Sequence, residues 1–178
     1  QVAEHYSRAA NGGVGYTKCS GNYGGQFYPT QLAQQEGYQQ IIWTDDATHT
    51  KLEEAGTMNV FFRIGDTLIT APTSERILDG VTRKSLIDIA KSKGINVEVR
   101  SIVIQELVDA HAKGELLKIF GAGTAVTIGQ IEGFAYQQKY YELPNVKDED
   151  SYAIMLKTNL QGIQQKAIED TFNWTEKI

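Results

Sequence analysis

Hydrophobic residues recur along the chain with periods typical of strands in some segments and of helices in others. Two apolar runs on either side of Gly65-Asp66 predict a β-hairpin, because a short glycine-containing link between strand-like runs is typical of a tight turn. Helical spacing before Gly94 predicts a helix that this glycine caps. The predicted strands are residues 41–43, 58–64, 67–70, 97–104, 117–120 and 125–131. The predicted helices are residues 26–38, 82–93, 105–113 and 151–168.

These elements mix without the strict alternation of strand and helix that a doubly wound sheet requires, so the pattern predicts an α+β fold. No internal repeat, linker or low-complexity tract divides the chain, and we expect one domain over residues 1–178. Because the first residue is Gln1 rather than Met, we expect further sequence upstream.

Composition narrows the classes of function. Of the 178 residues, 41% are hydrophobic and 22% charged, which is enough apolar material for a real core. The net charge is −5, and the basic residues do not form a cluster. This charge pattern argues against nucleic acid or an acidic membrane surface as the binding partner. No apolar run approaches the roughly 20 residues that a membrane span needs. Cys19 is the only cysteine, and His5, His49 and His111 lack metal-ligand spacing, so we expect no disulfide and no metal site.

The segment LDGVTR at residues 78–83 places Gly80, Val81 and Thr82 directly before a predicted helix. A helix start offers unpaired N–H groups and the positive end of the helix dipole, which suit a phosphate or a carboxylate. The alternative is an ordinary helix start with Thr82 as its cap.

A second glycine-rich segment, FGAGTA at residues 120–125, is predicted to turn so that backbone amides near Gly121 and Gly123 face a ligand, with the Thr124 hydroxyl as a further donor. It matches neither the phosphate-binding P-loop nor the dinucleotide fingerprint. Taken alone, this turn is weak support for a binding site.

Lys18 lies within the glycine-rich stretch of residues 11–25. A lysine amine in a ligand cavity is a nucleophile if it is desolvated or close to other cations, whereas most lysines are solvated surface residues. Glu53 and Glu54 also have two possible roles. One of the two carboxylates could pair with a cationic ring nitrogen of a ligand, or both could be solvated at the entry to a strand.

Together these segments resemble the fold-type IV pyridoxal-phosphate enzymes and, among them, the branched-chain amino-acid aminotransferases. The similarity extends from about residue 2 to the end of the chain. The matching segments, in the order of the family, are RAANGGVGYTKCSGNYGG (8–25), IIWTD (41–45), EEAGTMNVFF (53–62), ILDGVTRKSLIDIAKSKGI (77–95), FGAGTAVTI (120–128) and FNWT (172–175).

The resemblance implies a mixed-sheet pseudo-barrel flanked by helices, the large domain of these enzymes. It implies pyridoxal 5'-phosphate as cofactor and transamination of leucine, isoleucine or valine with 2-oxoglutarate, a step in branched-chain amino-acid biosynthesis. A cytoplasmic homodimer is the expected assembly. The family has two domains, so the smaller N-terminal one would lie outside this chain.

The resemblance also implies roles for single residues. Lys18 matches the lysine that forms the internal aldimine with the cofactor and later moves a proton. Tyr23 matches the tyrosine that binds the phenolic oxygen of the cofactor, and Glu54 matches the partner of its pyridine nitrogen. Thr57 matches a residue beside the ring. The remaining implied cofactor contacts are Leu78, Gly80, Val81, Thr82, Gly123 and Thr124, and the implied contacts to a substrate carboxylate are Thr124 and Ala125.

The chain departs from the family at a few positions. Asp79 replaces a frequent proline, and Val126 and Gly129 occupy the positions of a redox cysteine pair found in some members, so no such switch is expected. Cys19 matches no family role. Alternative functions are D-amino-acid aminotransferase, aminodeoxychorismate lyase, or a fragment that binds the cofactor without turnover.

Overall fold

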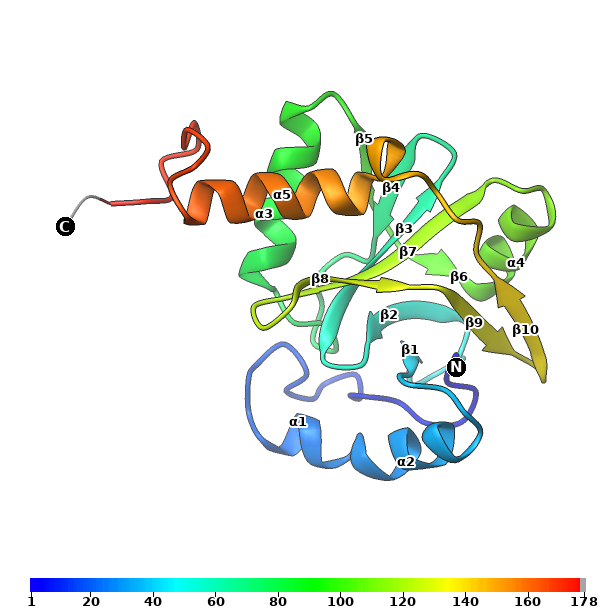
Figure 1. Ribbon diagram of the computed structural model, residues 1–178. Coiled ribbons are helices and arrows are strands. Elements are labelled where there is room, and N and C mark those ends of the chain that lie inside the picture. Colours follow the sequence, from blue (N-terminus) through cyan, green and yellow to red (C-terminus); the bar gives the residue numbers. More distant parts are fainter. Residues whose placement is uncertain (177–178) are drawn as a thin grey trace.

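The computed structural model describes residues 1–176, and its centre is an eight-stranded mixed sheet (Figure 1). The strands are β1 (Ile42–Thr44), β2 (Lys51–Ala55), β3 (Met58–Ile64), β4 (Thr67–Thr70), β5 (Asn96–Val99), β6 (Ile102–Val103), β7 (Leu116–Gly123) and β8 (Thr127–Ile131), with β9 (Gly133–Tyr136) and β10 (Lys139–Glu142) as a separate hairpin. The helices are α1 (Gly21–Gly24), α2 (Phe27–Gln35), α3 (Val81–Ser92), α4 (Ile104–Ala112) and α5 (Tyr152–Gln164), with a single 3-10 turn, η1 (Asp148–Asp150).

Strand β3 is the hub of the sheet. It pairs along one edge with β7 and along the other first with β2 and then with β4. All these pairs are antiparallel, and only β4 and β5 run parallel among the paired strands of the described chain. The mixed helix-and-sheet fold is the predicted one, but the path of paired strands does not return on itself within residues 1–176. The described strands therefore form an open sheet rather than a closed pseudo-barrel.

Each face of the sheet carries its own apolar core, because successive strand residues point to opposite faces. Helices α3 and α5 cover the face that presents Phe61 and Phe120, whose stacked rings lie 5.1 Å apart. Helix α4 and the β9–β10 hairpin cover the other face, with Val60 and Phe62 at its centre. Helix α2 packs on β1 through Ala33 and Trp43. Figure 1 shows α1 and α2 together below the sheet, away from α3 and α5.

The unit β4–α3–β5 determines where helix α3 begins. Two parallel neighbouring strands need a crossover, which here is α3 packed on the sheet. Helix α3 therefore starts beyond the carboxyl end of β4, the edge at which α/β units bind ligands.

Several predicted boundaries are wrong. The strand predicted at 97–104 is divided into β5 and β6 at Arg100–Ser101, and Ile104 already belongs to α4. The C-terminal helix ends at Gln164 rather than at residue 168, and α2 ends at Gln35 before Gly37, whose φ of 91° stops it. Strands β2, β9 and β10 and the short helix α1 were not predicted.

The turn predicted at residues 121–125 is also displaced. Gly121 and Gly123 belong to β7 and pair with β8, and the turn covers residues 124–126. The reason for glycine here is packing: a Cβ on Gly121 would lie 2.6 Å from the Met58 Cε atom. The two glycines make room for the Met58 side chain at the end of β7, and the turn itself begins only at Thr124.

Candidate functional site

The Glu54 carboxylate, on β2, is the centre of a buried polar cluster. Only 3% of Glu54 is exposed. Its Oε1 atom accepts hydrogen bonds from the Leu78 backbone N–H at 3.1 Å and from the Asn59 amide at 3.0 Å, and Oε2 forms an ion pair with the Arg8 guanidinium. Glu54 and Asn59 face each other across the β2–β3 pair, which explains their contact.

Burial raises the pKa of Glu54 from 4.5 to about 7, against the opposing effects of the Arg8 charge, the Leu78 amide and, more weakly, the Lys18 charge. Desolvation disfavours the charged form of a carboxyl group, and here it outweighs the neighbouring cations. A carboxyl group poised near neutral pH in a cluster of this kind marks a candidate functional site.

We expect the titration of Glu54 to lower the free energy of unfolding as the pH rises from 4.5 to about 7. In this window the folded protein keeps a proton on Glu54 that the unfolded chain has lost, so deprotonation favours unfolding. The contribution is favourable below the window and lost above it. Urea unfolding of the wild type and of Glu54→Gln across this range measures it, since the variant lacks the titrating group. Parallel pH curves for the two proteins would contradict the assignment.

Arg8 joins Glu54 to the glycine-rich segment. Besides the ion pair, its guanidinium donates to the Gly15 carbonyl at 2.8 Å and to the Arg76 carbonyl. Arg8 is buried, with 9% exposed. The neighbouring carboxylate Glu53 is also buried but pairs with the Arg76 Nε atom at 2.7 Å. The structure thus gives the two adjacent glutamates different partners. Sequence reasoning assigned no role to Arg8, whose partners are 7 to 68 residues away.

The loop that carries Lys18 is shaped by Asn22. The buried Asn22 amide donates to the Val14 carbonyl at 2.8 Å and to the Thr17 carbonyl at 2.9 Å. Lys18 itself is exposed, with its Nζ atom 5.5 Å from the centre of the half-buried Tyr23 ring. The loop therefore holds Lys18 and Tyr23 together, and the Lys18 charge reaches Glu54 electrostatically.

Helix α3 begins with an uncapped end. Gly80 is its N-cap and no side chain caps it, so the alternative that Thr82 serves as the cap is wrong. Val81 is exposed and Thr82 half-buried in the first turn. Arg83 is buried, and its Nε atom has no hydrogen-bond partner among the described residues. The Arg83 Nη2 atom donates to the Ala71 carbonyl at 2.7 Å. The free N–H groups and the Thr82 hydroxyl, with the cationic Arg83 side chain in the same turn, suit an anion such as a phosphate.

Two hairpin turns lie next to each other at the same end of the sheet. Thr57 follows Gly56 in the β2–β3 turn, and Thr124 and Ala125 begin the β7–β8 turn; all three are exposed. Their adjacency follows from the antiparallel pairing of β3 with β7, in which Asn59 lies opposite Ala122. A Cβ on Gly123 would accordingly be 3.3 Å from the Met58 Cγ atom. The structure thus places the predicted site residues on four segments around one end of the sheet.

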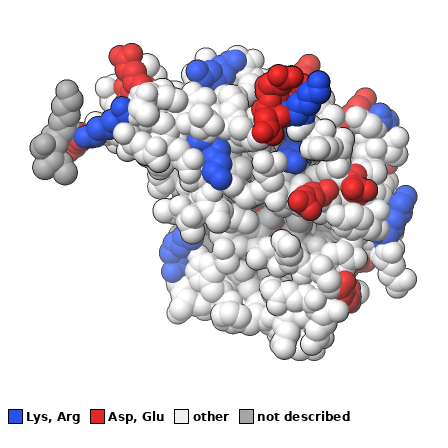
Figure 2. Space-filling model, viewed as in Figure 1, with Lys and Arg blue, Asp and Glu red and all other residues white. Residues whose placement is uncertain are grey.

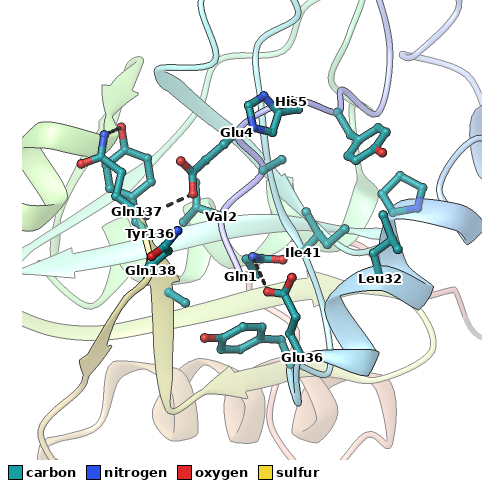
Figure 3. Close-up of a pocket in the computed structure, with 15 residues that line it drawn as sticks. Gln1, Val2, Glu4, His5, Leu32, Glu36, Ile41, Tyr136, Gln137 and Gln138 are labelled. Carbon is teal, nitrogen blue, oxygen red and sulfur yellow. Dashed lines mark hydrogen bonds between the residues drawn. The ribbon is translucent and has the colours of Figure 1, made fainter.

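A cavity of about 630 Å³ lies elsewhere, and none of the predicted site residues lines it. Figure 3 shows it between the N-terminal segment, α2 and the β9–β10 turn, with Gln1 hydrogen-bonded to Glu36 at 3.0 Å and the Gln137 N–H to Glu4 at 3.1 Å. Within residues 1–176 no cluster of three His, Cys, Asp or Glu side chains could hold a metal ion. In the same range no helix is both long and apolar enough to span a membrane.

Comparison with known proteins identifies the family. Residues 5–127, which include Lys18, Glu54 and the start of α3, match the amino-transferase class IV family. The chain therefore belongs to the amino-transferase class IV family. Curated proteins similar to this chain include branched-chain-amino-acid aminotransferase 2 of Bacillus subtilis, 34% identical over 177 residues, or 99% of this chain and 48% of that protein. A probable branched-chain-amino-acid aminotransferase of Staphylococcus aureus is 36% identical over 173 residues, or 97% of this chain and 48% of that protein.

Solved structures with similar backbones show the same fold. The branched-chain aminotransferase of Escherichia coli matches with a TM-score of 0.79 at 22% identity, over 99% of this chain and 55% of that one. The branched-chain aminotransferase of Thermobaculum terrenum in its PLP-bound holo-form matches with a TM-score of 0.73 at 20% identity, over 91% and 49%. This class IV chain spans about half the length of the relatives it matches.

Proposed function

We propose that the protein containing this chain is a pyridoxal-phosphate-dependent aminotransferase that exchanges amino groups between leucine, isoleucine or valine and 2-oxoglutarate. The observation that carries the proposal is the buried Glu54 carboxylate, held beside the start of α3 and within electrostatic reach of Lys18. The names of the relatives and the cofactor of the Thermobaculum terrenum structure support the same function.

The residues present suit this cofactor. The uncapped start of α3, with Gly80, Val81 and Thr82, would hold its phosphate, and the Arg83 side chain in the same turn would add positive charge nearby. Glu54 would hold the ring nitrogen. A carboxylate oxygen accepts two hydrogen bonds, and Arg8 is the only partner of Oε2 among the described residues, which leaves that atom room for an N–H.

Further contacts would come from the turns and the Lys18 loop. Tyr23 and Thr57 would flank the ring, while Leu78, Gly123 and Thr124 would complete the cradle, and Thr124 and Ala125 would receive the substrate carboxylate. Each of these residues lies on one of the four segments at this end of the sheet.

When bound, pyridoxal phosphate supplies an electron sink for the charge that develops at the substrate α-carbon. Glu54, as a carboxylate, would keep the ring nitrogen protonated, and the nearby cation would in turn favour the ionised form of Glu54. The Lys18 amine would bind the cofactor and then carry the proton that leaves the α-carbon. Anchoring the phosphate would keep the reacting atoms close to Lys18.

We expect pyridoxal phosphate to label Lys18. The protein containing this chain is incubated with the cofactor, reduced with borohydride and digested, and mass spectrometry locates the modified lysine. A label confined to the Lys18 peptide supports the proposal, and a label absent from it contradicts it. Activity with leucine but not with D-alanine would then separate the proposed reaction from that of a D-amino-acid aminotransferase.

We also propose that the intact protein is a cytoplasmic homodimer in which this chain forms one domain. The support for association is the stretch from residue 19 to 35, which has no charged side chain and exposes 76% of Phe27 and 61% of Tyr28. Figure 2 shows few charged side chains on this lower part of the surface. Exposed aromatic side chains of this kind mark interaction surfaces. Sedimentation velocity measures the assembly, and a monomer at micromolar concentration would contradict it.

A further inference from the structure

Asn59 is a buried amide that bonds to both sides of the candidate site. It is 4% exposed, on β3. The Nδ2 group donates to the Glu54 Oε1 atom at 3.0 Å and to the Leu78 carbonyl at 2.8 Å. The Leu78 N–H itself donates to the same Glu54 oxygen at 3.1 Å. Glu54, Asn59 and Leu78 thus form a closed three-membered set of hydrogen bonds.

The other end of the Asn59 amide packs on the start of α3. A Cβ built on Gly80 would lie 2.1 Å from the Asn59 Oδ1 atom and 3.4 Å from its Cγ atom. Gly80 has φ −66° and ψ 131°, which any residue adopts. Its backbone conformation therefore does not require glycine, and the close approach of Asn59 does.

We propose that Asn59 is a positioning residue that sets the spacing between the ring-nitrogen end and the phosphate end of the cofactor site. It holds the Glu54 carboxylate on one side and the Leu78–Gly80 segment, which leads into α3, on the other. The inference rests on the proposed function, because those two ends are defined by the cofactor. A side chain without an amide group, or with a longer one, would make neither the contact with Glu54 nor the contact with the Leu78–Gly80 segment.

The spacing role makes a prediction for three ligands. A ligand with two linked ends gains affinity from a site whose two halves are held at the matching distance, whereas each half alone does not need that distance. In Asn59→Ala we expect the affinity for pyridoxal phosphate to fall on the order of tenfold to a hundredfold, as for a lost hydrogen bond to a charged group. Pyridoxal and inorganic phosphate, titrated separately, should each lose much less.

The packing contact can be tested without the cofactor. We expect Gly80→Ala to lower the melting temperature of the cofactor-free protein in the wild-type background, since the added methyl group meets Asn59. In the Asn59→Ala background the same change should cost little, because the nearest remaining atom is the Arg83 Cβ at 3.7 Å. Gly129→Ala is the matched control, with only ordinary contacts at 3.7 Å or more, and its effect should be the same in both backgrounds.

The outcomes separate this inference from the proposed function. Equal losses for pyridoxal phosphate and for inorganic phosphate alone, or additive effects of Asn59→Ala and Gly80→Ala on melting temperature, would overturn the spacing role. Borohydride labelling of Lys18 in the Asn59→Ala protein would leave the proposed function standing in that case. An unlabelled Lys18 in the wild-type protein would overturn the function instead.

Discussion

Lys18→Ala is expected to reduce leucine transamination by on the order of a thousandfold or more, because it removes the amine that would bind the cofactor and move the proton. Lys18→Arg should be similarly inactive, since a guanidinium keeps the charge but does not give up its proton. Because Lys18 is exposed, neither change should alter the free energy of unfolding by more than about 0.5 kcal/mol. Single-turnover kinetics and urea unfolding measure the two effects.

Cys19→Ser is the control for Lys18. The neighbouring Cys19 is exposed, and we assign it no role, so this variant should keep near-normal activity. An active Lys18→Ala enzyme would remove the lysine from the mechanism. An equally inactive Cys19→Ser enzyme would show that the loop, rather than the Lys18 amine, is being measured.

Arg8→Met is expected to cost about 3–5 kcal/mol of folding free energy, because it removes the cation that favours ionised Glu54 and leaves the Gly15 and Arg76 carbonyls without this donor. The double variant with Glu54→Gln should recover part of the loss, since no charge then remains unpaired. Chemical denaturation measures both values.

Arg100→Met provides the comparison for Arg8. Arg100 forms two ion pairs, with Glu98 and Glu106, where Arg8 forms one, but the Arg100 side chain is 39% exposed. Exposed pairs contribute about 0–1 kcal/mol. A cost of Arg8→Met no larger than that of Arg100→Met would show that burial does not make the Arg8–Glu54 pair important.

Local patterns predicted the regular elements well where the buried positions of an element are apolar. The β3–β4 hairpin has the predicted bounds, because its strands are buried on both faces and form apolar runs on either side of a glycine turn. Helix α3 differs by one residue at each end, because its helical apolar spacing matches a core on one side. Strand β2 escaped prediction because its buried positions include Glu53 and Glu54. A glutamate in a sequence predicts an exposed position, because buried carboxylates are rare unless they have a partner, and the sequence does not show the partner.

The structural reason for a glycine was difficult to predict from the sequence. The pattern at 121–125 predicts a ligand-facing turn, yet Gly121 and Gly123 lie within β7 because Met58 needs the space. Gly80 was assigned to an anion site, and the structure adds that Asn59 needs its missing side chain. The sequence shows a glycine but not the reason for it: a turn, a bound ligand or a neighbouring side chain can each exclude a Cβ atom at that position.

By itself, the sequence determined the mixed helix-and-sheet class and, through the spacing of its motifs, the resemblance to a family and the identity of Lys18 and Glu54 as candidates. Only the tertiary structure decided how Glu54 is held, with Arg8 46 residues before it and Leu78 24 residues after it. The physical reason is that periodicity records which side of an element is apolar, a local property. Pairing of a buried charge depends on groups that only folding brings together.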